Sequence, residues 1–148
     1  MEVILVNDNE ILEQLFSLRR KVFVEEQGVP PELERDEEDL SAFHAAVIQN
    51  GEVIGTGRLV VKGSSGKIGR MAVAEEWRGK GVGSMTLGKL LEIGDEKRLA
   101  QICLHSQLQA KPFYLKHGFK PIGDIFEEAG ILHQEMILFI TPESQPPD

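Results

Sequence analysis

The sequence predicts an α/β fold built on a mixed, mostly antiparallel β-sheet. Three observations lead to this prediction. Two apolar runs flank Asn50-Gly51, a dipeptide that favours a β-hairpin. A further apolar run at 68–73 passes through a glycine-rich turn into a segment with helical periodicity. Near the end of the chain, residues 120–130 and 131–140 predict a last pair of strands.

The chain begins with a predicted strand over residues 2–6, followed by an amphipathic helix. Asn7 and Glu10 have the spacing of a capping box, the reciprocal pair that begins many helices. Apolar residues then recur at helical spacing as far as Val22. The helix is expected to end near Gly28, because the prolines that follow cannot continue its hydrogen-bond pattern.

An acidic segment, ELERDEEDL at 32–40, comes next. It allows two interpretations. Charge runs of this kind are most often a solvated short helix or loop. The functional alternative is an acidic rim that attracts a cationic amine.

The first hairpin is predicted to join strands over 42–48 and 52–61, since Asn-Gly tolerates positive φ at both central positions of a type I′ turn. The sequence GSSG at 63–66 predicts a flexible loop. After this loop, residues 67–73 are expected to return as the next strand of the sheet.

The second half of the chain supplies the remaining elements. The helix after the glycine-rich turn is expected to end near Gly94, and residues 100–105 predict another strand. The length of 148 residues predicts a single domain over 1–148. The polar residues 141–148 predict a flexible tail.

The glycine-rich turn has the features of an anion-binding site. A helix N-terminus carries unpaired N–H groups and positive dipole charge, and glycines let the backbone approach a ligand. We therefore expect a diphosphate ligand. The spacing fits neither a Walker loop nor a dinucleotide-binding fingerprint, and a turn that merely needs glycines is the remaining alternative. The turn reads Arg78-Gly79-Lys80-Gly81-Val82-Gly83.

The composition indicates an ordinary globular protein, which we expect to be cytoplasmic. No apolar run approaches the roughly 20 residues of a membrane helix. A formal charge of −8 argues against nucleic acid as a partner and suits a cationic substrate, although acidity can also serve solubility alone. We interpret Cys103 as a buried thiol rather than a nucleophile, and we expect no metal site.

Two segments resemble the GNAT superfamily of N-acetyltransferases. Arg78, Gly81 and Gly83 match the family's Gln/Arg-x-x-Gly-x-Gly/Ala loop for the acetyl-CoA pyrophosphate. Residues 110–119, AKPFYLKHGF, resemble its A-x-x-F-Y-x-x-x-G-F helix. The N-terminal half, through RRKVFVEEQGVPPE, is similar to the ElaA-type and YjcF-type branch of the superfamily.

The resemblance implies the GNAT fold, with helices on both faces of the sheet, and acetyl-CoA as co-substrate. It places the pantetheine arm along the backbone of Met71, Ala72 and Val73. Gln107 stands where many members carry a cofactor-binding asparagine. The pyrophosphate would lie against Arg78, Gly79, Lys80, Gly81, Val82, Gly83 and Ser84. A local basic patch would then comprise Arg70, Arg78, Lys80 and Lys116.

The implied reaction is acetyl transfer to a primary amine of a small molecule by direct attack in a ternary complex. Tyr114 stands at the position of the family's usual general acid, which would protonate the departing thiolate. The backbone N–H of Ala72 or Val73 could face the thioester oxygen if the strand splays there. His105 is the candidate base closest in sequence to this site. Further candidates for the base are Glu25, Glu26, His44, Glu127 and His133.

Two other functions stay open at this point. One is a non-catalytic acyl-CoA-binding module, and the other is a structural domain that binds no CoA. The resemblance also allows a homodimer, and it implies no membrane partner.

Overall fold

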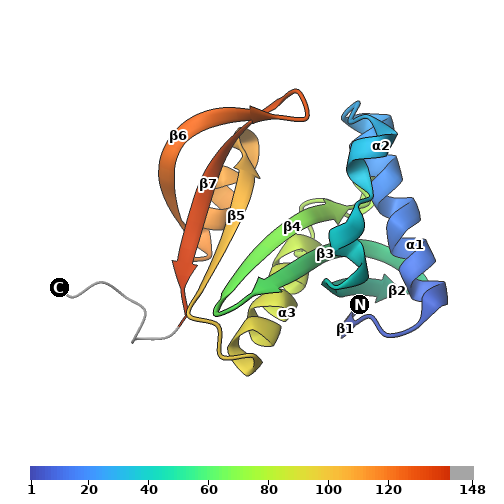
Figure 1. Cartoon of the computed structure of the whole chain (residues 1–148). Helices are drawn as coiled ribbons and strands as arrows, with labels where there is room; N and C mark the ends of the chain where they lie inside the picture. Colours follow the sequence, from blue (N-terminus) through green and yellow to red (C-terminus); the bar gives the residue numbers. More distant parts are fainter. Residues whose placement is uncertain (141–148) are drawn as a thin grey trace.

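The computed structural model describes residues 1–140, which form a seven-stranded sheet with helices on both faces (Figure 1). The strand order is β1-β2-β3-β4-β5-β7-β6, and every neighbouring pair is antiparallel except β4 and β5. The predicted mixed, mostly antiparallel sheet is confirmed. The predicted tail, 141–148, lies outside the described residues. The strands are β1 (Glu2–Leu5), β2 (Phe43–Gln49), β3 (Glu52–Lys62), β4 (Ser65–Val73), β5 (Gln101–Gln107), β6 (Lys120–Glu128) and β7 (Ile131–Phe139).

Two long helices cover opposite faces of the sheet. Ala45 and Ala46 are adjacent on β2, so their side chains point to opposite faces. Ala45 packs in the same core cluster as Leu87 of α3, and Ala46 packs in the cluster of Leu15 from α1. The helical elements are α1 (Asn9–Arg19), η1 (Arg20–Glu26), α2 (Pro31–Glu34), η2 (Glu37–Leu40), η3 (Glu75–Trp77), α3 (Val82–Glu96), η4 (Leu108–Ala110) and α4 (Lys111–Lys116).

The first helix differs from its prediction at its start and ends close to the predicted Gly28. Its N-cap is Asp8, whose carboxylate accepts the N–H of Ile11 at 2.8 Å, so the predicted capping box of Asn7 and Glu10 is wrong. After Arg19 the chain continues without a break as the π-helix η1. This wider turn carries the helix on to Glu26.

Both predicted hairpin turns are present. Asn50 and Gly51 have φ values of 52° and 78°, and Ala129 and Gly130 have 52° and 78°. Positive φ at both central residues is what a type I′ turn requires. The predicted GSSG loop is shorter than expected, because β4 already begins at Ser65.

β4 and β5 are paired over only part of their lengths. Their parallel ladder runs from Ser65 and Gln101 to Ile68 and Leu104, and then the strands separate. A bulge lies just beyond the last pair, where β4 uses one residue more than β3 between consecutive registers. Arg70 sits in this bulge with a φ of 53°. The splay that the sequence allowed in this part of β4 is therefore present.

Candidate active site

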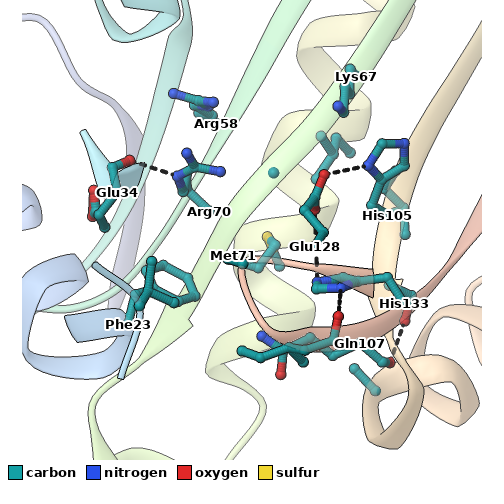
Figure 2. A pocket seen from close by; sticks show the side chains of 18 of the residues that line it. Phe23, Glu34, Arg58, Lys67, Arg70, Met71, His105, Gln107, Glu128 and His133 are labelled. Atoms are coloured by element: carbon teal, nitrogen blue, oxygen red, sulfur yellow. Dashed lines mark hydrogen bonds and ion pairs between the residues drawn. The ribbon is translucent and has the colours of Figure 1, made fainter. Parts of the chain in front are cut away.

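A cavity of about 610 Å³ opens where β4 and β5 separate (Figure 2). Its volume falls within the range of small-molecule sites. It has two sides that come from different parts of the chain. What we call the N-terminal wall contributes Phe23, Val29, Leu33, Glu34, Asp36, Arg58, Arg70 and Met71. The C-terminal wall contributes His105, Gln107, Tyr114, Glu128, Ile131 and His133.

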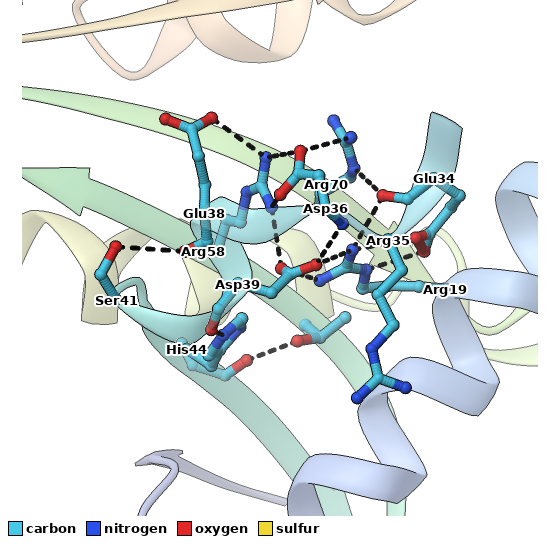
Figure 3. Close-up of polar contacts among 12 residues, drawn as sticks. Arg19, Glu34, Arg35, Asp36, Glu38, Asp39, Ser41, His44, Arg58 and Arg70 are labelled. Carbon is cyan, nitrogen blue, oxygen red and sulfur yellow. Dashed lines mark hydrogen bonds and ion pairs between the residues drawn. The ribbon is translucent and has the colours of Figure 1, made fainter. Parts of the chain in front are cut away.

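The N-terminal wall rests on a buried network of arginines and carboxylates (Figure 3). Arg19, which is 1% exposed, pairs with Glu34 at 2.8 Å and with Asp39 at 2.7 Å. Arg58 pairs with Asp36 at 2.7 Å and with Asp39 at 2.8 Å. Asp39 therefore pairs with two guanidinium groups and connects Arg19 to Arg58.

Arg70 completes this network from the bulge in β4. Its Nε donates to the Glu34 carbonyl at 2.9 Å, and its Nη2 contacts the Leu33 carbonyl at 3.1 Å and Asp36 at 3.2 Å. Its expected place in a basic patch for the pyrophosphate is therefore wrong. Burial, and then the neighbouring Arg58 and Arg19, lower the pKa of Arg70.

Two residues of the acidic segment fit neither interpretation, although exposed residues such as Glu32 and Glu37 do lie in short helices. Glu34 and Asp39 are buried and paired with arginines, so they form neither a solvated loop nor a rim open to an amine. The hydrogen bond from Arg58 lowers the pKa of Asp36. Burial alone would raise the pKa of Asp39, but hydrogen bonds from Arg19, the Asp36 N–H and Arg58 hold it well below its usual range.

The C-terminal wall carries a carboxylate between two histidines. Nδ1 of His105 lies 3.1 Å from Oε1 of Glu128, and Nε2 of His133 lies 3.8 Å from Oε2 (Figure 2). The ring of Phe126 stacks on His133 and meets His105 edge to face. We call His105, Glu128 and His133 the histidine–glutamate cluster.

Hydrogen-bond partners determine which ring nitrogens carry protons in this cluster. A carboxylate only accepts, so His105 places a proton on Nδ1 toward Glu128. Nδ1 of His133 lies 2.7 Å from the carbonyl of Ile131, so it too carries a proton. In the neutral rings both Nε2 atoms then hold a lone pair, which makes them proton acceptors.

Tyr114 lies at the base of the C-terminal wall. Its side chain packs edge to face on Phe113 and Phe119, and the residue is 7% exposed. Burial raises its pKa to about 12. Its hydroxyl makes no hydrogen bond to any residue in 1–140. It is therefore a protonated phenol at neutral pH with a donor still available.

The other candidate bases lie elsewhere or are already paired. Glu26 pairs with Arg78 at 2.8 Å, and Glu25 and Glu127 are exposed residues that do not line the cavity. His44 is buried, with Nε2 3.0 Å from the Asp39 carbonyl. Glu128 was not predicted. Strand alternation together with the Ala129-Gly130 turn could have identified it, because they set Glu128 and Phe126 on one face and Glu127 on the other.

The glycine-rich turn forms an open backbone loop at the start of α3. Gly79 and Gly81 have φ values of 75° and 85°, and a Cβ at either would meet nothing within 4 Å. Gly81 is the N-cap of α3 and offers no side-chain acceptor, so the first-turn amides are left to a ligand. A Cβ on Gly83 would lie 3.5 Å from the Phe113 ring. These features fit a diphosphate.

The side chains of this turn were expected to lie against one pyrophosphate, but they have different partners in the structure. Arg78 donates from Nε to the Val73 carbonyl and pairs with Glu26, so it braces the turn. Lys80 lies over the ring of Trp77 at 5.2 Å. The side chain of Val82 is buried in the core, which leaves its backbone for a ligand. The hydroxyl of Ser84 lies 3.2 Å from Nε2 of His117.

The residues predicted along the pantetheine arm follow the separated part of β4. Met71 lines the cavity, Ala72 is 3% exposed, and Val73 ends the strand. On the opposite strand, Gln107 donates to Oε1 of Gln27 at 2.8 Å. This bond links the two walls of the cavity.

Three expectations concerned a cysteine nucleophile, a metal site and a membrane helix. Cys103 is half-buried, does not line the cavity, and has its pKa raised mainly by burial, so it has no features of a nucleophile. Within residues 1–140, no group of three or more histidines, cysteines and carboxylates could hold a metal ion. No helix in that range is long and apolar enough to cross a membrane.

The fold and the loop are those of the GNAT family of acyl-CoA N-acyltransferases. Residues 6–139 match the family described as the acetyltransferase (GNAT) domain, and the chain belongs to this family. It is 34% identical over 138 residues to the uncharacterized N-acetyltransferase YjcF of Bacillus subtilis, covering 93% of this chain and 99% of YjcF.

Solved structures agree with this assignment. The crystal structure of Escherichia coli ElaA matches with a TM-score of 0.84 and 29% identity over 93% of this chain and 99% of ElaA. An aminoglycoside 6′-N-acetyltransferase complexed with coenzyme A matches with a TM-score of 0.78 and 19% identity over the whole of both chains. The resemblance to the GNAT superfamily and to its ElaA-type and YjcF-type branch is confirmed.

Proposed function

We propose that this protein transfers the acetyl group of acetyl-CoA to a primary amine of a small molecule, by direct attack in a ternary complex. The observation that carries the proposal is the separation of β4 and β5. It opens a cavity that holds Tyr114 and the histidine–glutamate cluster, and Phe113, next to Tyr114, lies against Gly83 of the glycine-rich turn. The solved relative complexed with coenzyme A supports the choice of co-substrate.

Binding of acetyl-CoA would use the two parts of the protein that fit it. The pyrophosphate would accept hydrogen bonds from the loop amides at Gly79 to Ser84, with Lys80 adding positive charge. The pantetheine arm would lie along Met71 to Val73, where β4 has lost its β5 partner. Bound acetyl-CoA supplies an activated thioester carbonyl.

The histidine–glutamate cluster would receive the amine. An alkylammonium has a pKa near 10 and must lose a proton before it can attack a carbonyl. Glu128 would attract the ammonium, and His105 would accept its proton at Nε2, directly or through water. A carboxylate that fixes the Nδ1–H tautomer in this way also stabilises the imidazolium that forms.

The transfer requires one bond to form and one to break. The amine nitrogen bonds to the acetyl carbon as the carbon–sulfur bond breaks, and a backbone N–H of Ala72 or Val73 would stabilise charge on the carbonyl oxygen. Tyr114 would donate to the departing sulfur. The second amine proton leaves through water, so one proton is released in total.

The raised pKa of Tyr114 limits what this residue can contribute. A thiol has a pKa of about 8.5, so complete proton transfer from a phenol at about 12 would be uphill. A hydrogen bond to the developing thiolate needs no such transfer. We therefore assign Tyr114 to stabilising the leaving group, with the proton arriving finally from solvent.

Thermal unfolding with and without acetyl-CoA tests the proposal. A ligand at about a hundred times its Kd adds roughly 2.7 kcal/mol to stability, which raises Tm by several degrees in a domain of this size. The shift should disappear in Gly81→Val, which blocks the loop, and persist in Gly63→Ala, a turn glycine with positive φ far from it.

Thiol release with a panel of amines then tests catalysis. A Tm shift without turnover of any amine would favour a non-catalytic acyl-CoA-binding module. Absence of any shift at saturating acetyl-CoA would refute the proposed function.

A further inference from the structure

The charged side chains of the cavity differ in how far they are paired. On the N-terminal wall, Arg58 is neutralised by Asp36 and Asp39. Two other cations of this cavity keep donors for a ligand. Lys67 makes no ion pair within residues 1–140, and Nη1 of Arg70 makes no hydrogen bond there.

These two cations flank an open stretch of cavity floor. Lys67, Gly69 and Arg70 are close neighbours on β4, and all three line the cavity. Figure 2 shows the side chains of Lys67 and Arg70. A Cβ on Gly69 would meet nothing within 4 Å, so the floor between the cations is bare. The bulge that gives Arg70 its positive φ is what brings its side chain to this position. An anionic group fits above Gly69.

The histidine–glutamate cluster, which lies beside Lys67 on the β5 side of the cavity, favours a cation instead (Figure 2). Glu128 has no arginine or lysine within ion-pair distance among the described residues, and both of its contacts are histidines. Its side chain is 47% exposed, so a ligand can reach it. Glu128 is therefore the carboxylate of this cavity that an ammonium can reach and pair with.

The remaining lining includes apolar side chains. Phe23, Val29, Leu33, Met71 and Ile131 all contribute to the cavity. A ligand that satisfies both kinds of charged group therefore carries an ammonium and an anionic group close together, and it has an apolar body.

We infer that the acceptor is a zwitterion: an amino acid or similar amine whose ammonium binds at Glu128 and whose carboxylate lies over Gly69 between Lys67 and Arg70. This inference rests on the proposed function and specifies its substrate class. It predicts that a dication is a poor acceptor, because its second ammonium would face Lys67 and Arg70. A plain alkylamine would be intermediate, since it leaves the cations without a partner.

Matched acceptors test the inference directly with the full chain and acetyl-CoA. One set is γ-aminobutyrate, butylamine and putrescine, and the other is leucine, leucinamide and isoamylamine. Within at least one set, kcat/KM for the zwitterion should exceed that for each of its relatives by about tenfold or more, the usual worth of a charged hydrogen bond. Equal or better turnover of putrescine and the alkylamines would overturn the inference.

Three variants locate the carboxylate. Lys67→Met should reduce the preference for the zwitterion about tenfold by raising KM, whereas Lys21→Met, which removes the same charge from an exposed site outside the cavity, should not change it. Gly69→Val should raise KM for the zwitterion with little change in Tm, because the added side chain enters open space. Unchanged KM values in both cavity variants would overturn the placement.

Binding of acetyl-CoA separates failure of this inference from failure of the proposed function. If the Tm shift with acetyl-CoA is present but none of the six acceptors is acetylated, the zwitterion inference is refuted and the cofactor assignment stands. If the shift itself is absent, the proposed function is refuted first.

Discussion

Both walls of the cavity contain charged residues, but these residues are paired differently in the two walls. In the N-terminal wall, carboxylates and guanidinium groups are buried and satisfy one another. In the C-terminal wall, Glu128 meets only histidines, and its side chain remains half exposed. A buried charge that is fully paired has a structural role, because removing its partner destabilises the fold. A charge with incomplete partners can bind a ligand or move a proton. The pairing of the charges in a pocket therefore indicates their role better than their number does.

The largest effect is expected on stability, from removing the charge of Asp39 beneath the N-terminal wall. Asp39→Asn leaves Arg19 and Arg58 buried with too few carboxylates, a kind of change that costs about 3–5 kcal/mol. Chemical denaturation should show this loss of unfolding free energy. Glu37→Gln, in the same segment but exposed, should stay within about 0.5 kcal/mol of the parent. A small loss at Asp39 would mean that the network contributes little.

The parent protein and Asp39→Asn should respond differently to acid. Because the pKa of Asp39 is lowered by folding, its stabilisation is fully present above its unfolded pKa of about 3.9 and is lost as pH falls through the folded value. The stability gap between parent and Asp39→Asn should therefore be constant from about pH 7 to 5 and narrow below pH 4. Urea denaturation across this range measures the gap, and a gap that widened in acid would contradict the assignment.

A smaller effect, confined to activity, is expected from the C-terminal wall. Glu128→Gln removes the charge that attracts the ammonium and orients His105, so kcat/KM should fall about ten- to hundredfold. The Tm should hardly change. Glu127→Gln, its exposed neighbour on the other face, is the matched control and should be active. The pH dependence of kcat/KM should also change in Glu128→Gln, which a merely structural residue would not cause.

The smallest effect is expected at Tyr114. If it stabilises the thiolate by a hydrogen bond without complete proton transfer, Tyr114→Phe should lower kcat about tenfold and leave KM for acetyl-CoA nearly unchanged. Steady-state kinetics checks both values. A loss of several thousandfold would instead show that the phenol supplies the proton in the rate-limiting step.

Local signals in the sequence predicted the parts of this structure that are formed by neighbouring residues. Asn50-Gly51 specifies its hairpin because few other dipeptides accept positive φ twice, and Gly81 marks the start of α3 for a similar reason. The contacts of Asp39 with Arg19 and Arg58 join residues 19 or 20 positions apart, and no pattern within one element encodes them.

The candidate site also combines residues that a local motif predicts with features that no local motif predicts. Tyr114 could be placed from a motif, whereas separating Glu128 from Glu127 requires strand alternation to be combined with the register that the Ala129-Gly130 turn sets. The bulge at Arg70 was hidden, because an extra residue in one strand is visible only against its partner. It depends on how β3 and β4 align.

The partial ladder between β4 and β5 has a consequence for hydrogen exchange. Amides of β4 that face β5 are bonded across the ladder up to Ile68, and those from Gly69 to Val73 have no β5 partner. Protection from deuterium should therefore drop within a single strand, although both halves of β4 remain attached to β3. A boundary between slow and fast exchange inside one strand is a signature by which this sheet can be recognised in solution.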